Sequence, residues 1–178
     1  IVLKPHIAPA KAPLITSMAA VAVARAITNI TGLKANIKWP NDILIDGKKV
    51  CGILTEMQGD MDAIHYVVVG IGINVNLTSA DFPEELEDRA TSLKIESGEF
   101  IPRAKLIRAI LKELEGIYIQ YGKTEDAGSI ISEIKENSAT IGNRVRVMGV
   151  NLDMEGVAVD VADDGALMVM LDNGQIRK

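Results

Sequence analysis

Lysine, asparagine, aspartate and glycine residues, types that often line sites for anionic ligands, are concentrated between residues 38 and 76. Lys38-Trp39-Pro40-Asn41-Asp42 is followed by Gly47-Lys48-Lys49-Val50-Cys51-Gly52 and then by Gly70-Ile71-Gly72-Ile73-Asn74. A lysine carries a positive charge, and a glycine inside a strand often marks a place where a ligand approaches the backbone closely. The cluster therefore predicts one part of a ligand-binding site.

Alternating apolar and polar residues predict the strands that position this cluster. Residues 33–39 alternate strictly, and Pro40 ends that strand because proline cannot donate to a β-ladder. A second strand covers residues 43–45, and Asp46-Gly47 is a strong signal for a two-residue hairpin turn. The return strand is expected from Lys48 to about Met57.

The strand predicted at residues 64–76 differs on its two faces. Its odd positions from Val67 to Val75 are all apolar, which favours packing against a helical layer. Its later even positions are Gly70, Gly72, Asn74 and Asn76. This second face, bare backbone followed by two amides, predicts the floor of a pocket.

Three helices are expected around these strands. Residues 14–30 are apolar nearly all round, with Arg25 as the only charge, which is typical of a helix buried against a sheet. Pro102 is expected to open an amphipathic helix that Gly122 closes, and a shorter helix is expected at residues 126–137. Residues 77–101 are polar and predicted to be irregular.

The apolar period changes from helical to two after residue 138, which predicts a small β-barrel or sandwich. The resulting fold class is α+β, with a larger domain at residues 1–137 and a smaller one at 138–178. A module of this size rarely folds well alone, so we expect it to lean on the larger domain.

Composition limits the classes of function. The 178 residues are 48% hydrophobic and 3% aromatic, and the net charge is −5. The chain has no polybasic run, which argues against non-specific nucleic-acid binding. A single cysteine excludes an internal disulfide and fits a reducing, cytoplasmic compartment. We expect no membrane span and no signal peptide. Because the chain opens without a methionine, in what looks like mid-strand, we expect it to be the later part of a longer protein.

Three motifs together resemble biotin protein ligases, the biotin–[acetyl-CoA-carboxylase] ligases. They are Lys38 to Asp42, Gly47 to Glu56 and Gly70 to Asn76, and the later Arg89-Ala90-Thr91-Ser92-Leu93 also matches. The resemblance covers nearly the whole chain. It implies a mixed β-sheet with packed helices, related to class II aminoacyl-tRNA synthetases and lipoate ligases, followed by an SH3-like barrel. It also implies an Arg/Gly-rich loop upstream of Ile1, which closes over biotin and phosphate in that family.

The resemblance implies a two-step reaction. The biotin carboxylate attacks the α-phosphate of ATP in the presence of Mg²⁺, and a lysine of a biotin carboxyl carrier protein then attacks the resulting biotinyl-5′-AMP. Lys49 is implied to contact the biotin carboxylate and the α-phosphate. Asp42 is implied either to help hold Mg²⁺ or to orient the incoming amine, and the sequence does not choose between these roles.

The remaining implied site residues would contact ATP or biotin. Asn41, Asp42 and Asn74 would face the nucleotide, with Asn74 bonding adenine, while Lys38 would form a wall of the site. Gly52 would permit close approach of the biotin rings. Trp39 is expected in the core rather than against adenine.

Each role has a structural alternative that the sequence leaves open. Lys38 and Lys49 could be solvated lysines, and Lys48 is the better candidate for that class. Asn41 and Asp42 could simply serve the turn, Asn74 could cap the end of its strand, and Gly52 could mark a bulge.

Other residue types are expected to be structural. Cys51 is interpreted as a small core residue, and Thr91 and Ser92 as loop residues with local backbone bonds. His6 and His65 lack the partners that a metal site needs.

Three other functions compete with ligation of biotin to a carrier protein. They are a biotin-sensing repressor core, a ligand-binding remnant without catalysis, and a ligase for lipoate or octanoate. The turn at Lys38 to Asp42 and the all-β end favour biotin over lipoate. Edge strands of the main sheet leave a homodimer open.

Overall fold

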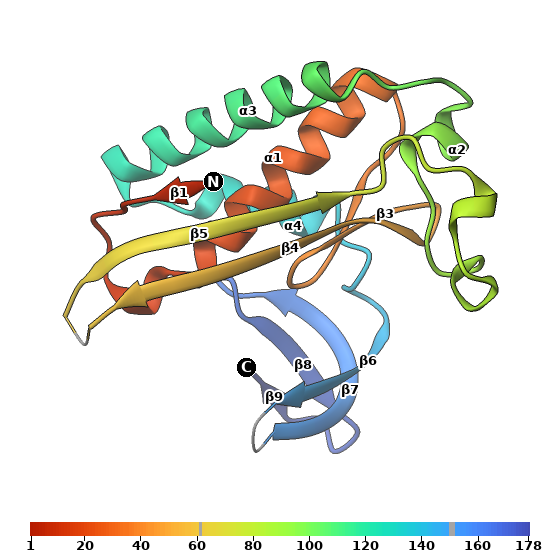
Figure 1. The fold of residues 1–178 in the computed structure, drawn as a ribbon. Helices are drawn as coiled ribbons and strands as arrows, with labels where there is room; N and C mark the ends of the chain where they lie inside the picture. The colour runs from red at the N-terminus through yellow and green to blue at the C-terminus, as the bar shows by residue number, and fades with distance from the viewer. Residues whose placement is uncertain (61, 150–151) are drawn as a thin grey trace.

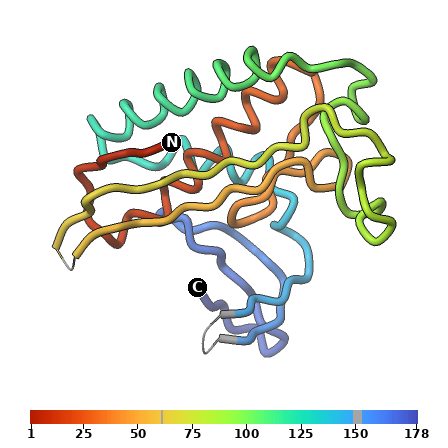
Figure 2. The backbone as a smooth tube through the Cα atoms, in the orientation of Figure 1, coloured from red at the N-terminus to blue at the C-terminus, as the bar shows by residue number. Residues whose placement is uncertain are grey.

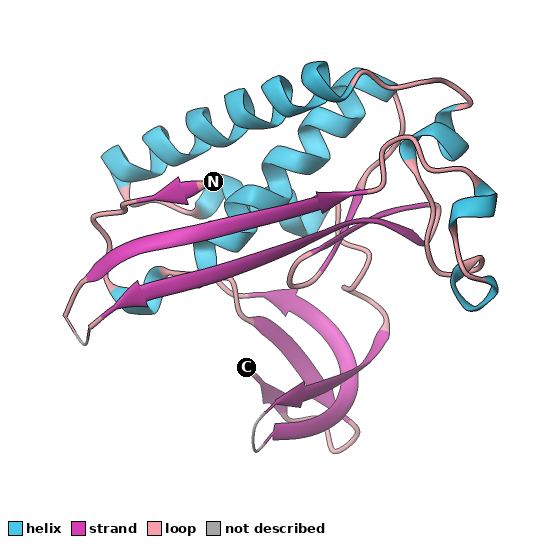
Figure 3. Ribbon diagram, in the orientation of Figure 1, coloured by secondary structure: helices cyan, strands magenta, loops and turns pink. Residues whose placement is uncertain are grey.

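Helices cover one face of a five-stranded sheet, and a second, smaller sheet follows at the C-terminal end of the chain (Figure 1). This computed structural model describes residues 1–60, 62–149 and 152–178. The N-terminus lies beside the helical layer, whereas the C-terminus lies beside the second sheet (Figure 2). The α+β class predicted from the sequence is confirmed, since helices and strands occupy separate layers (Figure 3).

The main sheet has the strand order β1-β5-β4-β3-β2. Every ladder between its strands is antiparallel among the described residues, which corrects the expected mixed sheet. Short hairpins join β2 to β3, β3 to β4 and β4 to β5, and a hairpin can only pair its strands antiparallel. The strands are β1 (Val2–Leu3), β2 (Asn36–Lys38), β3 (Asp42–Ile45), β4 (Lys48–Gly59) and β5 (Ile64–Ile73).

The turn between β3 and β4 has the predicted residues and geometry. Asp46 and Gly47 both have positive φ, 47° and 80°, as a two-residue hairpin of this type requires. Two predicted strands are longer than those observed. The first is reduced to Asn36–Lys38, and β5 ends at Ile73, so Asn74 and Asn76 lie just beyond the sheet.

Helix α1 (Pro13–Thr31) is the centre of the core, as the apolar sequence predicted. Ile15, Met18 and Val21 are completely buried, and Gly32 ends the helix with a φ of 73°. The segment Pro9–Thr31, which includes the short helix η1 (Pro9–Lys11), is long and apolar enough to cross a membrane by length and composition. This corrects the expectation that no apolar run is long enough to span a membrane. However, 67% of the segment's apolar window is buried inside the protein.

Helices α3 (Arg103–Thr124) and α4 (Gly128–Glu136) pack against α1. Pro102 caps the start of α3 as expected, but the helix continues through Gly122 and ends at Thr124, with Glu125 as its C-cap. One glycine in a helix costs only about 1 kcal/mol, so the burial of Tyr121 in the last turn is enough to keep the helix going. Ile130, Ile131 and Ile134 of α4 are buried as predicted.

Residues 77–101, predicted to be irregular, contain three short helical turns. Ser92 caps the last of them, because its hydroxyl accepts a hydrogen bond from the Ile95 N–H at 3.1 Å. Its hydroxyl also donates to the Leu77 carbonyl at 2.6 Å, and Ser92 is fully buried. The turns are η2 (Ser79–Asp81), η3 (Glu84–Leu86) and α2 (Leu93–Ser97).

The C-terminal residues form an open antiparallel sheet in the order β6-β7-β8-β9. Among the described residues its outer strands β6 and β9 do not pair with each other, so the predicted barrel is not closed. The strands are β6 (Arg144–Gly149), β7 (Leu152–Val161), β8 (Leu167–Leu171) and β9 (Ile176–Arg177).

The second sheet is attached to the main sheet at β2. The Ile37 N–H donates to the Asn137 carbonyl at 2.7 Å, and the Ala139 N–H donates to the Ile37 carbonyl at 2.8 Å. Trp39 donates its ring N–H to the Gly165 carbonyl at 2.9 Å. The smaller unit therefore rests on the larger one, as its size led us to expect.

Candidate active site

Four of the chemistry-bearing positions form one row across the main sheet. Lys38 pairs with Asp42, Asp42 with Gly52, and Gly52 with Gly72, so the row crosses β2, β3, β4 and β5. Directly paired residues of antiparallel strands point to the same face. Because the alternate residues Ile37, Ile43 and Ile53 are buried on the helical side, the row lies on the face turned away from α1.

A β-bulge brings Lys49 to this same face. Ile43 pairs with Cys51 but Leu44 pairs with Lys49, so Val50 is an extra residue in β4. In a regular strand Lys49 and Gly52 would point to opposite faces, since they are three positions apart. The bulge instead turns both Val50 and Cys51 inward, where each is 1% exposed.

Lys49 and Asp42 form an ion pair directly above Gly52. The Lys49 Nζ lies 2.6 Å from Asp42 Oδ1, and the two side chains are 46% and 20% exposed. A Cβ built on Gly52 would lie 3.1 Å from that Nζ and 3.2 Å from Lys49 Cε. A side chain at position 52 would therefore push the end of Lys49 aside by a few tenths of an ångström.

The floor beside the ion pair is bare backbone. Gly70 pairs with Leu54 and Gly72 with Gly52, so three glycines adjoin on two neighbouring strands. A Cβ added at Gly70 or Gly72 would meet only a carbonyl oxygen of β4, at 3.6 and 3.8 Å. Leu54 lies at the end of this strip with 65% of its surface exposed. The strip offers a flat surface with one apolar wall next to a cation.

The main chain of Lys49 is held in place by a loop far away in sequence. Its N–H donates to the Arg89 carbonyl at 2.9 Å, and its carbonyl accepts from the Thr91 N–H at 3.0 Å. The side-chain amide of Asn74 donates to the Thr91 carbonyl at 3.0 Å, and the Asn74 N–H donates to the Val50 carbonyl. The segment from Arg89 to Thr91, picked out by resemblance, thus braces the lysine-bearing strand.

Asn41 and Trp39 are both engaged in structural contacts. Asn41 exchanges bonds with Ile53: its side-chain amide donates to that carbonyl at 2.7 Å, and its own carbonyl accepts from that N–H at 2.9 Å. Trp39 is half-buried against the core, as expected, with its ring N–H bonded to Gly165. Asn41 therefore closes the turn that presents Asp42.

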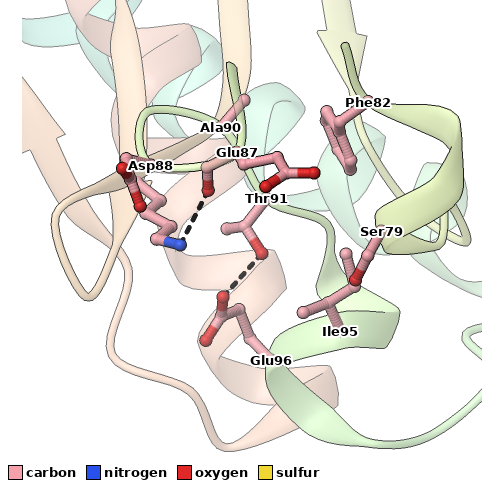
Figure 4. A pocket seen from close by; sticks show the side chains of 9 residues that line it. Ser79, Phe82, Glu87, Asp88, Ala90, Thr91, Ile95 and Glu96 are labelled. Carbon is pink, nitrogen blue, oxygen red and sulfur yellow. Dashed lines mark hydrogen bonds between the residues drawn. The ribbon is translucent and has the colours of Figure 1, made fainter. Parts of the chain in front are cut away.

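A separate pocket of about 280 Å³ adjoins the bracing loop, whose Ala90 and Thr91 are part of its lining (Figure 4). Lys48 donates to the Glu87 carbonyl at 2.8 Å there, and the Thr91 hydroxyl donates to Glu96 at 2.5 Å. Phe82 and Ile95 supply its apolar lining. Lys48 is thus bonded to the loop, whereas Lys49 points to the glycine strip.

Cys51 is a buried thiol of low reactivity. Its side chain faces the core, and burial, reinforced by the nearby Asp42 carboxylate, raises the pKa of the thiol to about 12. A thiol that ionises so weakly cannot act as a nucleophile near neutral pH. The prediction of a core cysteine is confirmed.

The described residues contain no cluster of three or more metal-binding side chains. Asp42 is the carboxylate at the candidate site, and one carboxylate suits a Mg²⁺ ion that keeps most of its contacts with water and substrate phosphates. The donor set therefore fits a metal that would arrive with a nucleotide.

The sequence patterns missed two features of this site. The bulge at Val50 is one, and its only mark is a pair of successive apolar residues, Val50 and Cys51, where alternation would allow one. The exposed Leu54 is the other, and continuing the alternation from Gly52 would have placed it on the site face.

The sequence of the chain is similar to those of known ligases. Residues 1–74 match the model of the biotin/lipoate A/B protein ligase family. The chain is 44% identical, over 98% of its length, to the bifunctional ligase/repressor BirA of Bacillus spizizenii. It is 38% identical, over 75% of its length, to the biotin–[acetyl-CoA-carboxylase] ligase of Mycobacterium tuberculosis. The chain is thus similar in sequence to biotin protein ligases.

A solved biotin protein ligase has the same fold. The enzyme from Aquifex aeolicus, in complex with biotin and ATP, superimposes with a TM-score of 0.84 at 27% identity. The similarity covers 99% of this chain and 72% of that one. The chain spans about half the length of the curated ligases, 53% of the Bacillus protein and 47% of the Mycobacterium protein.

Proposed function

We propose that this chain is part of a biotin protein ligase and provides the catalytic core for ATP-dependent biotinylation of a lysine on a biotin carboxyl carrier protein, through biotinyl-5′-AMP. The observation that carries the proposal is the Lys49–Asp42 pair, set over Gly52 and beside the glycine strip of Gly70 and Gly72. A cation next to an open, partly apolar surface suits a ligand with a flat body and a carboxylate.

The first step of the proposed reaction depends on Lys49. An anionic carboxylate must approach an anionic phosphate, and negative charge grows on the phosphate as the new bond forms. The Lys49 side chain is 46% exposed, so its ammonium can turn from Asp42 towards those oxygens. Because its main chain is bonded on both sides to Arg89 and Thr91, the side chain moves from a rigid base.

The second step needs a group that orients the incoming lysine amine, and we propose Asp42 for this role. Its carboxylate forms the ion pair with Lys49, and the Asp42 side chain is 20% exposed. It can therefore reach a substrate bound at the same place. Asp42 is also the residue that would hold Mg²⁺, whose chemistry is to neutralise phosphate charge.

The other proposed site residues surround this pair. Gly52 would lie under the biotin rings, and Lys38, in the same row as Asp42, would face the phosphates. Asn41 and Asn74 would lie on the adenine side, although their amide groups already bond the Ile53 and Thr91 carbonyls. Adenine recognition by either would therefore use its side-chain oxygen or a rearranged loop.

We also propose that the catalytic unit covers residues 1–137 and that residues 138–178 form the SH3-like module of the family. The four strands of β6–β9 and the contact of Trp39 with Gly165 support this division. A cytoplasmic location and a homodimer formed through the edge strand β1 complete the proposal.

Biotin-dependent exchange between ATP and pyrophosphate tests the function directly. It should be measured on the full-length protein and on residues 1–178 in parallel. We expect exchange by the full-length protein, because adenylate formation is reversible. Lack of exchange there, with folded protein and saturating biotin, would refute the ligase proposal. Exchange by the full-length protein alone would show that residues outside this chain complete the site.

A second candidate function is repression of transcription, because the similar Bacillus protein is named a ligase and repressor. Gel-shift assays of the full-length protein with promoter DNA, with and without biotinyl-5′-AMP, test this role. Adenylate-dependent retardation would support it, and its absence would leave ligation as the single proposed function.

A further inference from the structure

Beyond the end of β5, the bracing loop takes the place of that strand beside β4. Strand β5 ends at Ile73, whose partner on β4 is Cys51. At Lys49 the neighbour of β4 is instead Ala90, in an isolated parallel bridge. The main chain of Lys49 is therefore held by the loop at a point where the ladder with β5 has already ended.

The bulge that turns Lys49 towards the site is tied to the same loop. A bulge leaves its extra residue unpaired in the ladder, and here that residue is Val50. The Val50 carbonyl accepts from the Asn74 N–H at 2.8 Å, and the Asn74 side-chain amide donates to the Thr91 carbonyl at 3.0 Å. The Thr91 N–H donates to the Lys49 carbonyl at 3.0 Å. Thr91 is thus connected to Lys49 directly and to Val50 through one intermediate, so a shift of Thr91 would move the base of the lysine side chain.

The side chain of Thr91 is itself fixed by Glu96. Its hydroxyl donates to Glu96 Oε1 at 2.5 Å, and the two side chains point towards each other in Figure 4. Hydrogen bonds from a hydroxyl to an ionised carboxylate are short and strong. Thr91 is 2% exposed, so water does not easily replace this partner. Glu96 belongs to α2, whose first turn is capped by Ser92.

Thr91 and Glu96 lie on the pocket of Figure 4 rather than on the glycine strip. The lining of that pocket includes neither Asp42 nor Gly52. The pair would therefore influence the candidate site through the main chain of Lys49, without contact with a substrate bound over Gly52.

We propose that Thr91 and Glu96 are positioning residues, whose hydrogen bond holds the bulge in the register that places the Lys49 ammonium over Gly52. The inference rests on the proposed ligase function and deepens it. A misplacement of about 1 Å at a reacting group costs roughly a hundredfold in rate, so a loosened lysine should lose about tenfold. The loss should fall mainly on kcat, because the ammonium interacts most strongly with the charge that develops in the transition state.

Steady-state kinetics of biotin-dependent ATP–pyrophosphate exchange by the full-length protein test this proposal. Thr91→Val keeps the shape of the side chain and removes its hydroxyl, and Glu96→Ala removes the same bond from its half-buried end. We expect kcat to fall about tenfold in both variants. Thr91→Ser keeps a hydroxyl, and the matched control Ser97→Ala removes a hydroxyl that bonds Glu99 at the other end of α2. Both should stay within about twofold of wild type.

A double-mutant cycle shows whether Thr91 acts through Lys49. In a Lys49→Ala background the ammonium is absent, so adding Thr91→Val should lower exchange by less than about twofold. A further tenfold loss in that background would overturn the proposal, because Thr91 would then act on another part of the site.

The remaining outcomes separate this proposal from the proposed function. If the wild-type protein exchanges pyrophosphate and kcat is unchanged in Thr91→Val and Glu96→Ala, the positioning role is refuted and the ligase function stands. Equal losses in Thr91→Val and Thr91→Ser would also refute it, because packing rather than the hydroxyl would then be responsible. If melting curves show that Thr91→Val does not fold, Glu96→Ala alone decides between these results. Missing exchange in the wild-type protein would refute both proposals.

Discussion

Replacement of Lys49 by alanine separates a catalytic lysine from a structural one. Its ion pair with Asp42 involves a side chain that is 46% exposed, and such pairs contribute at most about 1 kcal/mol to stability. For a protein of this size that corresponds to a fall in Tm of about 2–4 °C. A cation that stabilises a developing phosphate charge contributes about 3–4 kcal/mol, or a factor of about 10²–10³ in rate.

Lys49→Ala in the full-length protein should therefore lose at least a hundredfold in biotin-dependent pyrophosphate exchange while remaining folded. Lys48→Ala is the matched control, since its neighbouring ammonium bonds the Glu87 carbonyl instead of facing the glycine strip. We expect this control to exchange within about twofold of wild type. Stopped exchange assays, with circular dichroism melts on the same samples, give both quantities.

The reasoning fails if Lys49→Ala exchanges at a rate close to wild type, because the lysine would then be a solvated surface residue. It also fails if Lys48→Ala loses as much activity as Lys49→Ala. That result would assign the effect to the hairpin or the bracing loop rather than to the ammonium over Gly52.

Three further predictions concern single positions. Gly52→Ala should fold normally but lose about tenfold or more in exchange, because its Cβ would lie 3.1 Å from the Lys49 ammonium; unchanged kinetics would contradict the packing argument. Cys51, with its pKa raised to about 12, should resist thiol reagents at pH 8 in the folded protein and react fully in denaturant, and labelling of the native protein would refute its burial. Tyr121→Phe should raise the unfolding free energy by about 1 kcal/mol in urea titrations, because its buried hydroxyl has no bonding partner among the described residues; a loss of stability would show that it has one.

Local patterns were sufficient to predict most of the elements. The apolar run of α1, the hairpin at Asp46-Gly47 and the helix after Pro102 each carry a signal within a few residues. The early end of β5 and the continuation of α3 through Gly122 were missed, because both depend on contacts with distant segments. Tertiary packing routinely overrides the preference of one residue.

The candidate site was predicted in residue type more than in geometry. The motifs pointed to Lys49, Asp42 and Gly52, but their convergence depends on the bulge at Val50, which alternation alone does not reveal. The turn and strand-end alternatives for Asn41 and Asn74 were open from the sequence, but their partners Ile53 and Thr91 could not be named because they lie outside the local motif.

The hydrogen bond of Trp39 to Gly165 has a practical consequence. This is the only tryptophan in the chain, and it lies where the two sheets meet, one residue from Lys38. Its fluorescence therefore comes from one place, the junction of the two sheets beside Lys38. The chain carries its own optical probe at that junction, and ligands arriving from either side can be followed there without a label.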